Sequence, residues 1–430
     1  MKDIFKELFS EFWSFGLPEV KKRNFFLPLN TGKITVLTGV RRCGKSFLMY
    51  EGMKNLIKSG VDKKNIIYLS FDDERIDCRV EDLDLILDAH LELHPNIKVS
   101  ELNFFFDGLN RISGWESFII RLHDQVTQNI YISGCNIQHL KHNLNPYLEN
   151  RSIILELFPL SWNEFCEFHN ISIIEKSTIN LARVERHFDL FFKQGGFPEL
   201  LTSNSRFHRS KLLTMINNIL FTDLIEAYDI KNTSFLKFLI NKIFQNNTTT
   251  ISIHKIFQDI KSQGFKCSKN SIYELMEQFN FIYLTNSCLK YDPSFVKSEQ
   301  SSKKTYPIDH SLLDLYDYNN INKEQKLECL VYLELRKRTD LIWHFNNGFK
   351  TDFIGKWQGK WNAIQVCWAL NDQETIKHEL KSLIKTCQKL NINTGWVVTR
   401  STNEEFMMED IEIKIMGITT FLEKHPLFSI

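Results

Sequence analysis

A short stretch, GVRRCGKS from Gly39 to Ser46, limits the possible folds of this chain more than any other feature. It matches the pattern GxxxxGK followed by Ser or Thr at every fixed position. A β-branched run at 33–38 leads into it, and apolar residues at helical spacing follow over 46–59. In such a loop, backbone N–H groups turn inward around phosphates, and the next helix adds the partial positive charge of its N-terminus. The stretch therefore predicts a phosphate-binding loop between a strand and a helix.

The residue types inside the loop suit a nucleotide and its metal ion. Lys45 is expected to neutralise the β and γ phosphates, and the Ser46 hydroxyl is expected to bind Mg²⁺. The other residues expected to contact the nucleotide are Gly39, Arg42, Cys43, Gly44 and Phe47. ATP and Mg²⁺ are therefore the expected cofactors.

A carboxylate, Asp107, directly follows the apolar run at 104–106. At the end of a parallel strand it is expected to reach the sheet edge beside the phosphate loop and to orient magnesium. It also suits a cap of the following turn, and the two roles are compatible. The next residue is Gly108, at a position where a glutamate usually polarises the attacking water. We therefore expect tight binding of Mg–nucleotide with slow hydrolysis.

Other carboxylates are candidates to replace that glutamate: Glu116 on the following helix, and Asp72, Asp73 and Glu74 after the strand at 65–71. Asp72 and Asp73 suit a place close to the phosphates because their strand ends at the same sheet edge, but neither stands at the position of the usual glutamate.

Strands and helices alternate along the first part of the chain, with strands expected at 33–38, 65–71, 104–107, 129–133 and 152–157. This alternation predicts a parallel α/β sheet covered on both faces. The pattern then becomes helical, 235–296 is typical of a winged helix, and strands return beyond a polar tract. The expected division is 1–32 for an N-terminal helix and lead-in, 33–164 for the core, 165–234 for a helical lid, 235–296 for the winged-helix segment, 297–305 for a linker and 306–430 for a second α/β domain.

The composition is that of a globular protein with buried cores, at 43% hydrophobic and 24% charged residues. A net charge of +1 gives no overall attraction to nucleic acid or membrane, although a local basic face stays open. The cysteines form no C-x-x-C pair, which favours reduced thiols. No apolar run approaches the roughly 20 residues that span a bilayer. We therefore expect a cytoplasmic protein without a membrane span.

Several further stretches resemble one known family. In the first part of the chain they are TGVRRCGKS, YLSFDDERI at 68–76, FFFDGLNRISGWESFIIRLHD at 104–124, IYISGCN at 130–136, NRSIILELFPLSWNEF at 150–165 and QGGFPEL at 194–200. In the last part they are YPIDHSLL at 306–313, KLECLVYLELRKR at 326–338, KTDFI at 350–354 and IQVCW at 364–368. Together they resemble the prokaryotic AAA+ ATPases that end in an uncharacterised domain similar to PD-(D/E)XK nucleases.

The resemblance implies a P-loop AAA+ parallel sheet with a helical lid, a winged-helix segment and a C-terminal α/β nuclease-like domain. It implies that Asp107 is the magnesium aspartate and that Asn136 is the polar sensor of the γ-phosphate. It also implies that Arg151 acts on the nucleotide, across a subunit boundary if the chain forms a homo-oligomer. Asn136 also suits a plain helix cap, and Arg151 an ordinary surface arginine.

The C-terminal stretches match the positions of a nuclease site. Two acids of such a site hold a divalent metal, and a lysine stabilises charge or positions water. Asp352 occupies the first position, and Glu328 is an additional candidate ligand. Gln365 and Cys367 stand where an acid and the lysine are expected, so we interpret the site as degenerate and the domain as retained for contact with nucleic acid or protein.

Nucleic acid is the leading class of partner. The winged-helix segment carries lysines that suit contacts with phosphates, namely Lys255, Lys261, Lys266, Lys269 and Lys290. Winged helices inside ATPases also serve in packing alone. We expect an ATP-binding protein whose slow hydrolysis is coupled to a conformational change and to DNA binding. A nucleotide-gated scaffold for a protein partner and an ATP-dependent nuclease are the two alternatives.

Overall fold

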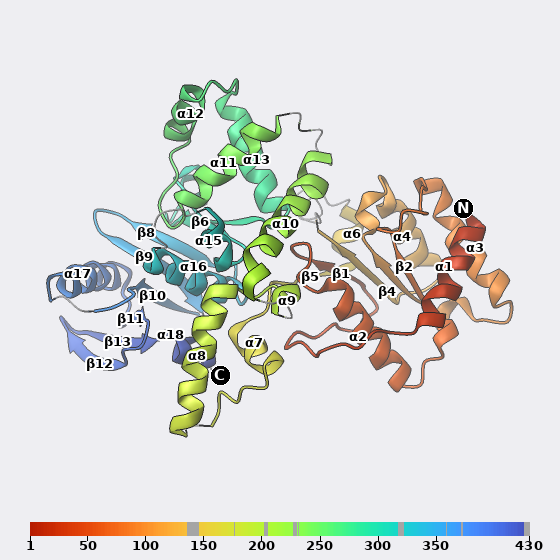
Figure 1. Cartoon of the computed structure of the whole chain (residues 1–430), viewed down its shortest axis with the longest axis horizontal. Helices are drawn as coiled ribbons and strands as arrows, with labels where there is room; N and C mark the ends of the chain where they lie inside the picture. Colours follow the sequence, from red (N-terminus) through yellow and green to blue (C-terminus); the bar gives the residue numbers. More distant parts are fainter. Residues whose placement is uncertain are drawn as a thin grey trace. The chain divides into compact units, whose positions relative to one another are not determined.

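A computed structural model describes residues 1–135, 146–175, 177–201, 205–226, 230, 232–316, 322–357, 359–370 and 373–424. The chain forms two units, each with its own sheet (Figure 1). The first unit is Met1–Phe158 with Phe281–Tyr283, and the second is Pro159–Asn280 with Leu284–Ile430.

The first unit is built on a five-stranded sheet in the order β2-β3-β4-β1-β5. Every neighbouring pair of strands is parallel, so their C-terminal ends meet at one edge. This arrangement confirms the parallel α/β sheet expected from the sequence. The strands are β1 (Ile34–Thr38), β2 (Ile66–Ser70), β3 (Asn103–Asp107), β4 (Ile130–Gly134) and β5 (Ser152–Glu156).

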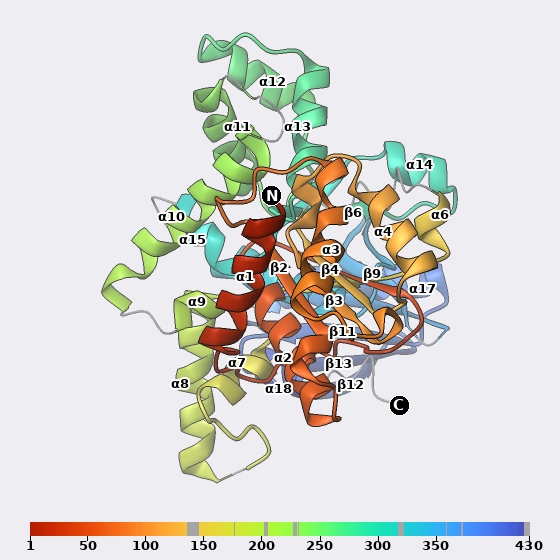
Figure 2. The same cartoon turned by 90° about the vertical axis from the view of Figure 1, so that its right-hand side faces the viewer.

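Helices cover both faces of this sheet (Figure 1, Figure 2). They are α1 (Lys2–Phe15), α2 (Lys45–Lys58), α3 (Asp84–Leu93), α4 (Trp115–Gln125) and α6 (Pro146–Glu149), with short 3-10 turns η1 (Lys63–Asn65), η2 (Val80–Asp82), η3 (Val99–Glu101) and η4 (Leu109–Arg111). Side chains of a strand alternate between faces. Phe104 and Phe106 therefore pack in the core that includes residues of α3 and α4. Phe105 points the other way, stacks on Tyr131 at 4.4 Å and lies near Gly52 of α2.

The second unit contains an eight-stranded mixed sheet in the order β12-β13-β11-β10-β9-β8-β6-β7. Its strands are β6 (Thr285–Lys290), β7 (Lys304–Pro307), β8 (Ile342–Asn346), β9 (Lys350–Trp357), β10 (Lys360–Val366), β11 (Thr394–Thr399), β12 (Glu404–Met408) and β13 (Ile411–Gly417). The strands β8, β9 and β10 pair antiparallel, and β11 pairs parallel to β10.

Its helices fall before, between and after these strands. They are α7 (Trp162–Phe168), α8 (Thr178–Gln194), α9 (Pro198–Leu201), η5 (Ser205–Phe207), α10 (His208–Leu220), the π-helix η6 (Phe221–Glu226), α11 (Thr233–Gln245), α12 (Ile253–Ser262), α13 (Lys269–Phe281), α14 (Phe295–Gln300), η7 (His310–Leu312), α15 (Leu313–Tyr316), α16 (Lys323–Arg336), α17 (Gln373–Leu390) and α18 (Ile418–Lys424). None of the helices in the described ranges combines the length and the apolar character that crossing a bilayer requires.

The tract 297–305, expected as a linker, contains the end of α14 and the start of β7. The strands β6 and β7 pair antiparallel, and β6 also pairs with β8. The sheet therefore runs across this tract. Its polar composition did not indicate a strand, because strand pairing uses backbone groups and depends on residues far away in the chain. The division of the chain into domains at these boundaries stays a prediction.

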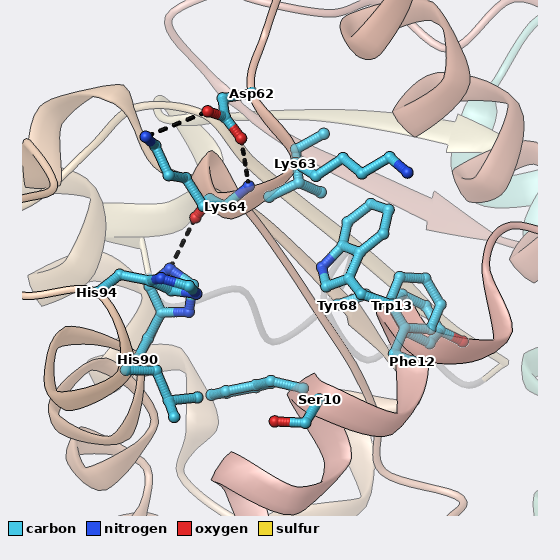
Figure 3. A pocket seen from close by; sticks show the side chains of 12 residues that line it. Ser10, Phe12, Trp13, Asp62, Lys63, Lys64, Tyr68, His90 and His94 are labelled. Carbon is cyan, nitrogen blue, oxygen red and sulfur yellow. Dashed lines mark hydrogen bonds and ion pairs between the residues drawn. The ribbon is translucent and has the colours of Figure 1, made fainter.

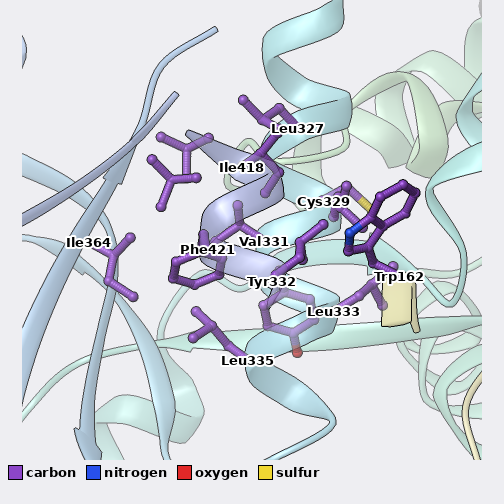
Figure 4. Close-up of a cluster of buried hydrophobic side chains, with 14 of the residues drawn as sticks. Trp162, Leu327, Cys329, Val331, Tyr332, Leu333, Leu335, Ile364, Ile418 and Phe421 are labelled. Atoms are coloured by element: carbon purple, nitrogen blue, oxygen red, sulfur yellow. The ribbon is translucent and has the colours of Figure 1, made fainter. Parts of the chain in front are cut away.

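The core of the second unit surrounds α16, as Figure 4 shows. The residues from Lys326 to Leu335 are all buried, so this helix is covered on every side. Trp162, Ile364 and Phe421 belong to the same cluster. The buried Lys326 is neutralised by Asp314, whose Oδ2 lies 2.7 Å from Nζ.

Three stretches that carry the family resemblance meet inside the second unit. The Gly196 N–H donates to Asp309 Oδ2 at 2.7 Å, and the Leu160 N–H donates to the Gly196 carbonyl at 2.7 Å. A Cβ on Gly195 would lie 2.1 Å from Asp309 Oδ1, so only glycine fits there. These residues therefore serve the fold of this unit.

Candidate functional site

The phosphate loop lies at the C-terminal end of β1, directly before α2. Gly39 has φ 145° and Gly44 has φ 105°, values that suit glycine. A Cβ on Gly39 would lie 2.1 Å from the carbonyl oxygen of Leu157, which follows β5. The loop backbone therefore approaches its neighbour more closely than any other residue type allows.

Lys45 is buried and its ammonium lies inside the loop. Nζ donates to the carbonyl oxygens of Gly39 and Val40, both at 2.9 Å, and lies 3.3 Å from Cys135 Sγ. Burial lowers the pKa of Lys45, but the sulfurs beside it and the Asp107 carboxylate outweigh this effect and raise the pKa to about 12. The side chain therefore stays charged where a phosphate group would lie.

The other predicted loop residues surround this ammonium. Ser46 lies in the first turn of α2, Cys43 is buried, and Arg42 and Phe47 are exposed. Arg23, from the lead-in segment, donates to the Cys43 carbonyl at 2.9 Å and to the Phe158 carbonyl at 3.1 Å. Arg23 therefore braces the loop, a role that the sequence did not indicate because its partners are backbone groups.

Asp107 ends β3 and is held by two hydroxyl groups. Tyr68 on β2 donates to Oδ2 at 3.3 Å, and Ser133 on β4 donates to Oδ1. Burial and the charge of Asp107 raise the pKa of Tyr68. Neither residue was expected from the sequence. The strand register brings them to Asp107, because it pairs Asp107 with Ser133 and with Ser70, two positions after Tyr68.

These residues suit a Mg–nucleotide. The loop offers backbone N–H groups at a helix N-terminus together with a buried ammonium, and both features fit phosphate oxygens. Ser46 and Asp107 supply the hydroxyl and carboxylate oxygens that Mg²⁺ prefers, so they are the residues that would hold it. When bound, Mg²⁺ would neutralise charge on the phosphate oxygens.

Gly108 adopts a left-handed conformation, with φ 75° and ψ 20°. Apart from the adjacent Asp107, a carboxylate beside it is that of Asp72, whose Oδ1 lies 3.7 Å from the position of a Cβ on Gly108. Of the other carboxylates noted in the sequence, Asp73 pairs with Arg75 at 2.9 Å, Glu74 is exposed, and Glu116 lies in the first turn of α4.

The structure does not bring Arg151 to the phosphate loop. Its carbonyl accepts from the N–H of Ile34 at the start of β1, so it lies at the opposite edge of the sheet. The guanidinium makes two bonds of 2.9 Å to Asp124. Any action of Arg151 on a nucleotide of a second subunit stays a prediction. Asn136 lies outside the described residues.

A second group of polar residues meets at the sheet of the second unit. Glu328 on α16 and Asp352 on β9 both contact Lys304 of β7, with Nζ 2.9 Å from Glu328 Oε1 and 3.1 Å from Asp352 Oδ1. Gln365 on β10 accepts from the Asp352 N–H at 3.2 Å and donates to Glu379 at 2.7 Å. The predicted residues therefore do lie together, and Lys304 supplies the positive charge that Cys367 lacks.

Burial gives these groups unusual proton affinities. Burial and the neighbouring charge of Asp352 raise the pKa of Glu328 to about 7. Burial lowers the pKa of Lys304, but the two carboxylates outweigh burial and raise it above its ordinary value. Among the described residues, no three His, Cys, Asp or Glu side chains are arranged to hold a metal ion. The ammonium of Lys304 is thus the cation between the two acids.

The helices α12 and α13 carry most of the lysines expected to face nucleic acid. Lys255, Lys261, Lys266 and Lys269 are exposed, and Lys290 is half-buried. Lys261 and Lys269 both lie over the ring of Phe257, at 4.9 Å and 5.8 Å. Four exposed lysines therefore lie on this segment, with Lys266 in the turn between the two helices.

A pocket of about 420 Å³ lies among α1, β2 and α3, and residues 39–46 are not among those that line it (Figure 3). Trp13, Tyr68, His90 and His94 are among its lining residues. His90 is buried, its Nε2 bonds to the Lys64 carbonyl at 2.8 Å, and burial lowers its pKa to about 4.

A known domain family matches most of the first unit. Residues 31–166 match the AAA domain family, and they contain the phosphate loop and Asp107, which supports nucleotide binding in general. The uncharacterized protein MJ1544 of Methanocaldococcus jannaschii is 30% identical over 395 residues, covering 90% of this chain and 86% of the relative. An uncharacterized protein of Haemophilus influenzae is 24% identical over 310 residues, covering 72% and 76%.

Among solved structures, the Aeropyrum pernix ORC1 protein in complex with DNA has 10% identity, a TM-score of 0.28, and covers 71% of this chain and 87% of its own. AMPPCP-bound DnaA from Aquifex aeolicus has 16% identity, a TM-score of 0.25, and covers 64% and 91%. At these scores the likeness supports no conclusion about this chain.

Proposed function

We propose that this chain binds Mg–ATP at the phosphate loop and hydrolyses it slowly, because it belongs to the same family as MJ1544 and carries an AAA domain. The observation that carries the proposal is the buried Lys45 ammonium between the Gly39 and Val40 carbonyls. A charged group is buried only when partners compensate its lost hydration. A loop of this shape is best suited to bind phosphate oxygens, which then become partners of the ammonium.

Slow hydrolysis follows from Gly108, which leaves no carboxylate at the usual position of the water-activating residue. Loss of such a group typically costs about 10²–10⁴ in rate. Nucleotide then acts mainly as a switch of conformation. The exposed lysines of α12 and α13 favour DNA as the partner of this switch, because phosphate contacts dominate the affinity of proteins for DNA.

Calorimetry of Mg–ATP binding tests the proposed nucleotide binding. ATP turnover measured on the same preparation tests the proposed slow hydrolysis. We expect saturable binding and a turnover below about 1 per second. Absence of binding contradicts the proposal. Turnover in the ordinary enzyme range that is unchanged in Gly108→Glu contradicts slow hydrolysis. A mobility-shift assay with duplex DNA tests the partner. If the chain binds DNA, the shift should weaken as the salt concentration rises from about 50 mM to about 200 mM. If the chain is a scaffold for a protein partner, the DNA should not shift at either salt concentration.

A second candidate function, metal-dependent cleavage of a phosphodiester, is favoured by one observation in the second unit. Lys304 contacts both Glu328 and Asp352, so two acids and a lysine lie together although they are not in one motif. In this proposal Glu328 and Asp352 would hold a divalent cation, and the Lys304 ammonium would face the charge that develops on the phosphate.

Cleavage of linear DNA in the presence of Mg²⁺ or Mn²⁺ tests this candidate. We expect slow cleavage that is lost in Asp352→Ala. The matched control is Asp340→Ala, an exposed acid of the same unit that pairs only at the surface with Arg336. Wild-type protein that cleaves with neither metal, or an Asp352→Ala variant that still cleaves, rules the candidate out.

A further inference from the structure

The side chain of Asp72 lies beside the position where a side chain at residue 108 would begin. A Cβ on Gly108 would lie 3.7 Å from Asp72 Oδ1 and 3.9 Å from its Cγ. A side chain at position 108 would therefore begin in contact with this carboxylate. The acidic group beside position 108 comes from the segment that follows the neighbouring strand β2.

The register of the sheet explains this placement. Ser70 at the end of β2 pairs with Asp107 at the end of β3, so the residues that follow both strands emerge at the same edge. The Phe71 N–H donates to the Asp107 carbonyl at 2.8 Å and extends the pairing by one residue. Asp72 is the next residue, and it lies beside Gly108.

Two arginines hold the Asp72 carboxylate. Arg111 Nη2 lies 2.7 Å from Oδ1, and Arg41 Nη1 lies 3.6 Å from Oδ2. Arg41 is part of the phosphate loop itself, so one of these contacts orients Asp72 toward the loop. About half of the Asp72 side chain is exposed, at 51%, which leaves room for water at the carboxylate.

We propose that Asp72 is the catalytic carboxylate of this site, in the role that residue 108 cannot perform. The inference rests on the proposed binding of Mg–ATP. Asp72 accepts a proton from water while the water oxygen forms a bond to the γ-phosphorus. The bond from that phosphorus to the β,γ-bridging oxygen breaks, and ADP leaves with the electron pair. The proton then passes from Asp72 to solvent, and Lys45 stabilises the charge on the phosphates.

If the role of Asp72 is purely structural, the variants are expected to behave differently. Exposed ion pairs contribute little to stability. If Asp72 only links Arg41 to Arg111, its loss alters loop order and nucleotide affinity but leaves turnover at saturating ATP unchanged. A catalytic role lowers turnover at saturation and leaves affinity intact. The two roles are therefore separated by measuring both quantities.

The test uses the full chain with Asp72→Asn, which keeps the size of the side chain, and Asp72→Glu, which keeps the charge. We expect Asp72→Asn to reduce turnover at saturating Mg–ATP by about 100-fold or more with unchanged affinity. Asp72→Glu should retain more activity than Asp72→Asn. The control is Glu74→Gln, an exposed carboxylate two residues further along the same loop, which should match the wild type.

Unchanged turnover in Asp72→Asn overturns the inference, and so does a wild-type turnover no higher than that of Lys45→Ala. Both outcomes leave the proposed nucleotide binding standing if Mg–ATP still binds the wild type. A wild type that does not bind Mg–ATP refutes the proposed function itself, and the role of Asp72 falls with it. A variant that loses affinity at constant turnover assigns Asp72 a structural role and also overturns the inference.

Discussion

Replacement of Lys45 by alanine is expected to weaken the binding of Mg–ATP strongly. The variant loses the ammonium that contacts the Gly39 and Val40 carbonyls and faces the phosphate position. Hydrogen bonds to charged groups contribute about 1.5–3 kcal/mol each, so the loss of two contacts to phosphate weakens binding by roughly 100-fold or more. Calorimetric titration with Mg–ATP measures the effect directly.

The matched control for this prediction is Lys58→Ala, because Lys58 lies exposed in the last turn of the same helix. It removes one positive charge from α2 without touching the loop, and it should bind as the wild type does. Nucleotide should also raise the melting temperature of the wild type and of Lys58→Ala but not of Lys45→Ala. Equal affinity of Lys45→Ala and the wild type would mean that the loop does not bind phosphate through this residue.

Replacement of Lys304 by methionine is expected to destabilise the second unit by about 3–5 kcal/mol at pH 8. The substitution leaves the Glu328 and Asp352 carboxylates buried without their shared cation. The control is Lys303→Met, because Lys303 is the adjacent lysine and makes an exposed pair with Glu299. Exposed pairs contribute about 0–1 kcal/mol, so Lys303→Met should unfold almost as the wild type does.

The effect of Lys304→Met should depend on pH in a defined direction. The pKa of Glu328 is about 7 in the folded chain and 4.5 ordinarily. A raised pKa means that its contribution to stability is full below about pH 4.5 and is lost as the pH rises to about 7. Without the ammonium, which lowers this pKa, protonation of Glu328 becomes still more favourable. The variant should therefore be much closer to the wild type at pH 5 than at pH 8.

Urea unfolding followed by tryptophan fluorescence measures this difference. Of the eight tryptophans, only Trp13 and Trp115 lie in the first unit, so the signal follows mainly the second. A destabilisation that is the same at both pH values would contradict a buried carboxylate pair as its cause.

Much of the candidate nucleotide site could be predicted because its signals are local. Gly39, Lys45 and Ser46 lie within one loop, and their chemistry depends on backbone turns and a helix start that a short stretch encodes. Asp107 was predictable from the apolar strand before it. The C-terminal acids Glu328 and Asp352 were located by resemblance, and they do lie together.

The missed residues act through contacts that cross the sheet. Tyr68 and Ser133 reach Asp107 from the two neighbouring strands, and Arg23 holds the loop through backbone carbonyls. Nothing in the local pattern of these residues marks them. Their roles depend on strand order and register, which are set by packing of the whole unit.

The sequence by itself determined that a phosphate-loop motif and the carboxylate of Asp107 stand at one edge of a parallel sheet, since both follow from short stretches of consecutive residues. It also showed that both sites lack an expected group, at Gly108 and at Cys367. Only the tertiary structure decided what stands in those places. Asp72 arrives beside Gly108 from the next strand, and Lys304 reaches Glu328 and Asp352 across 24 and 48 residues of chain. Chemistry depends on which side chains meet in space, and folding brings together groups that no motif connects.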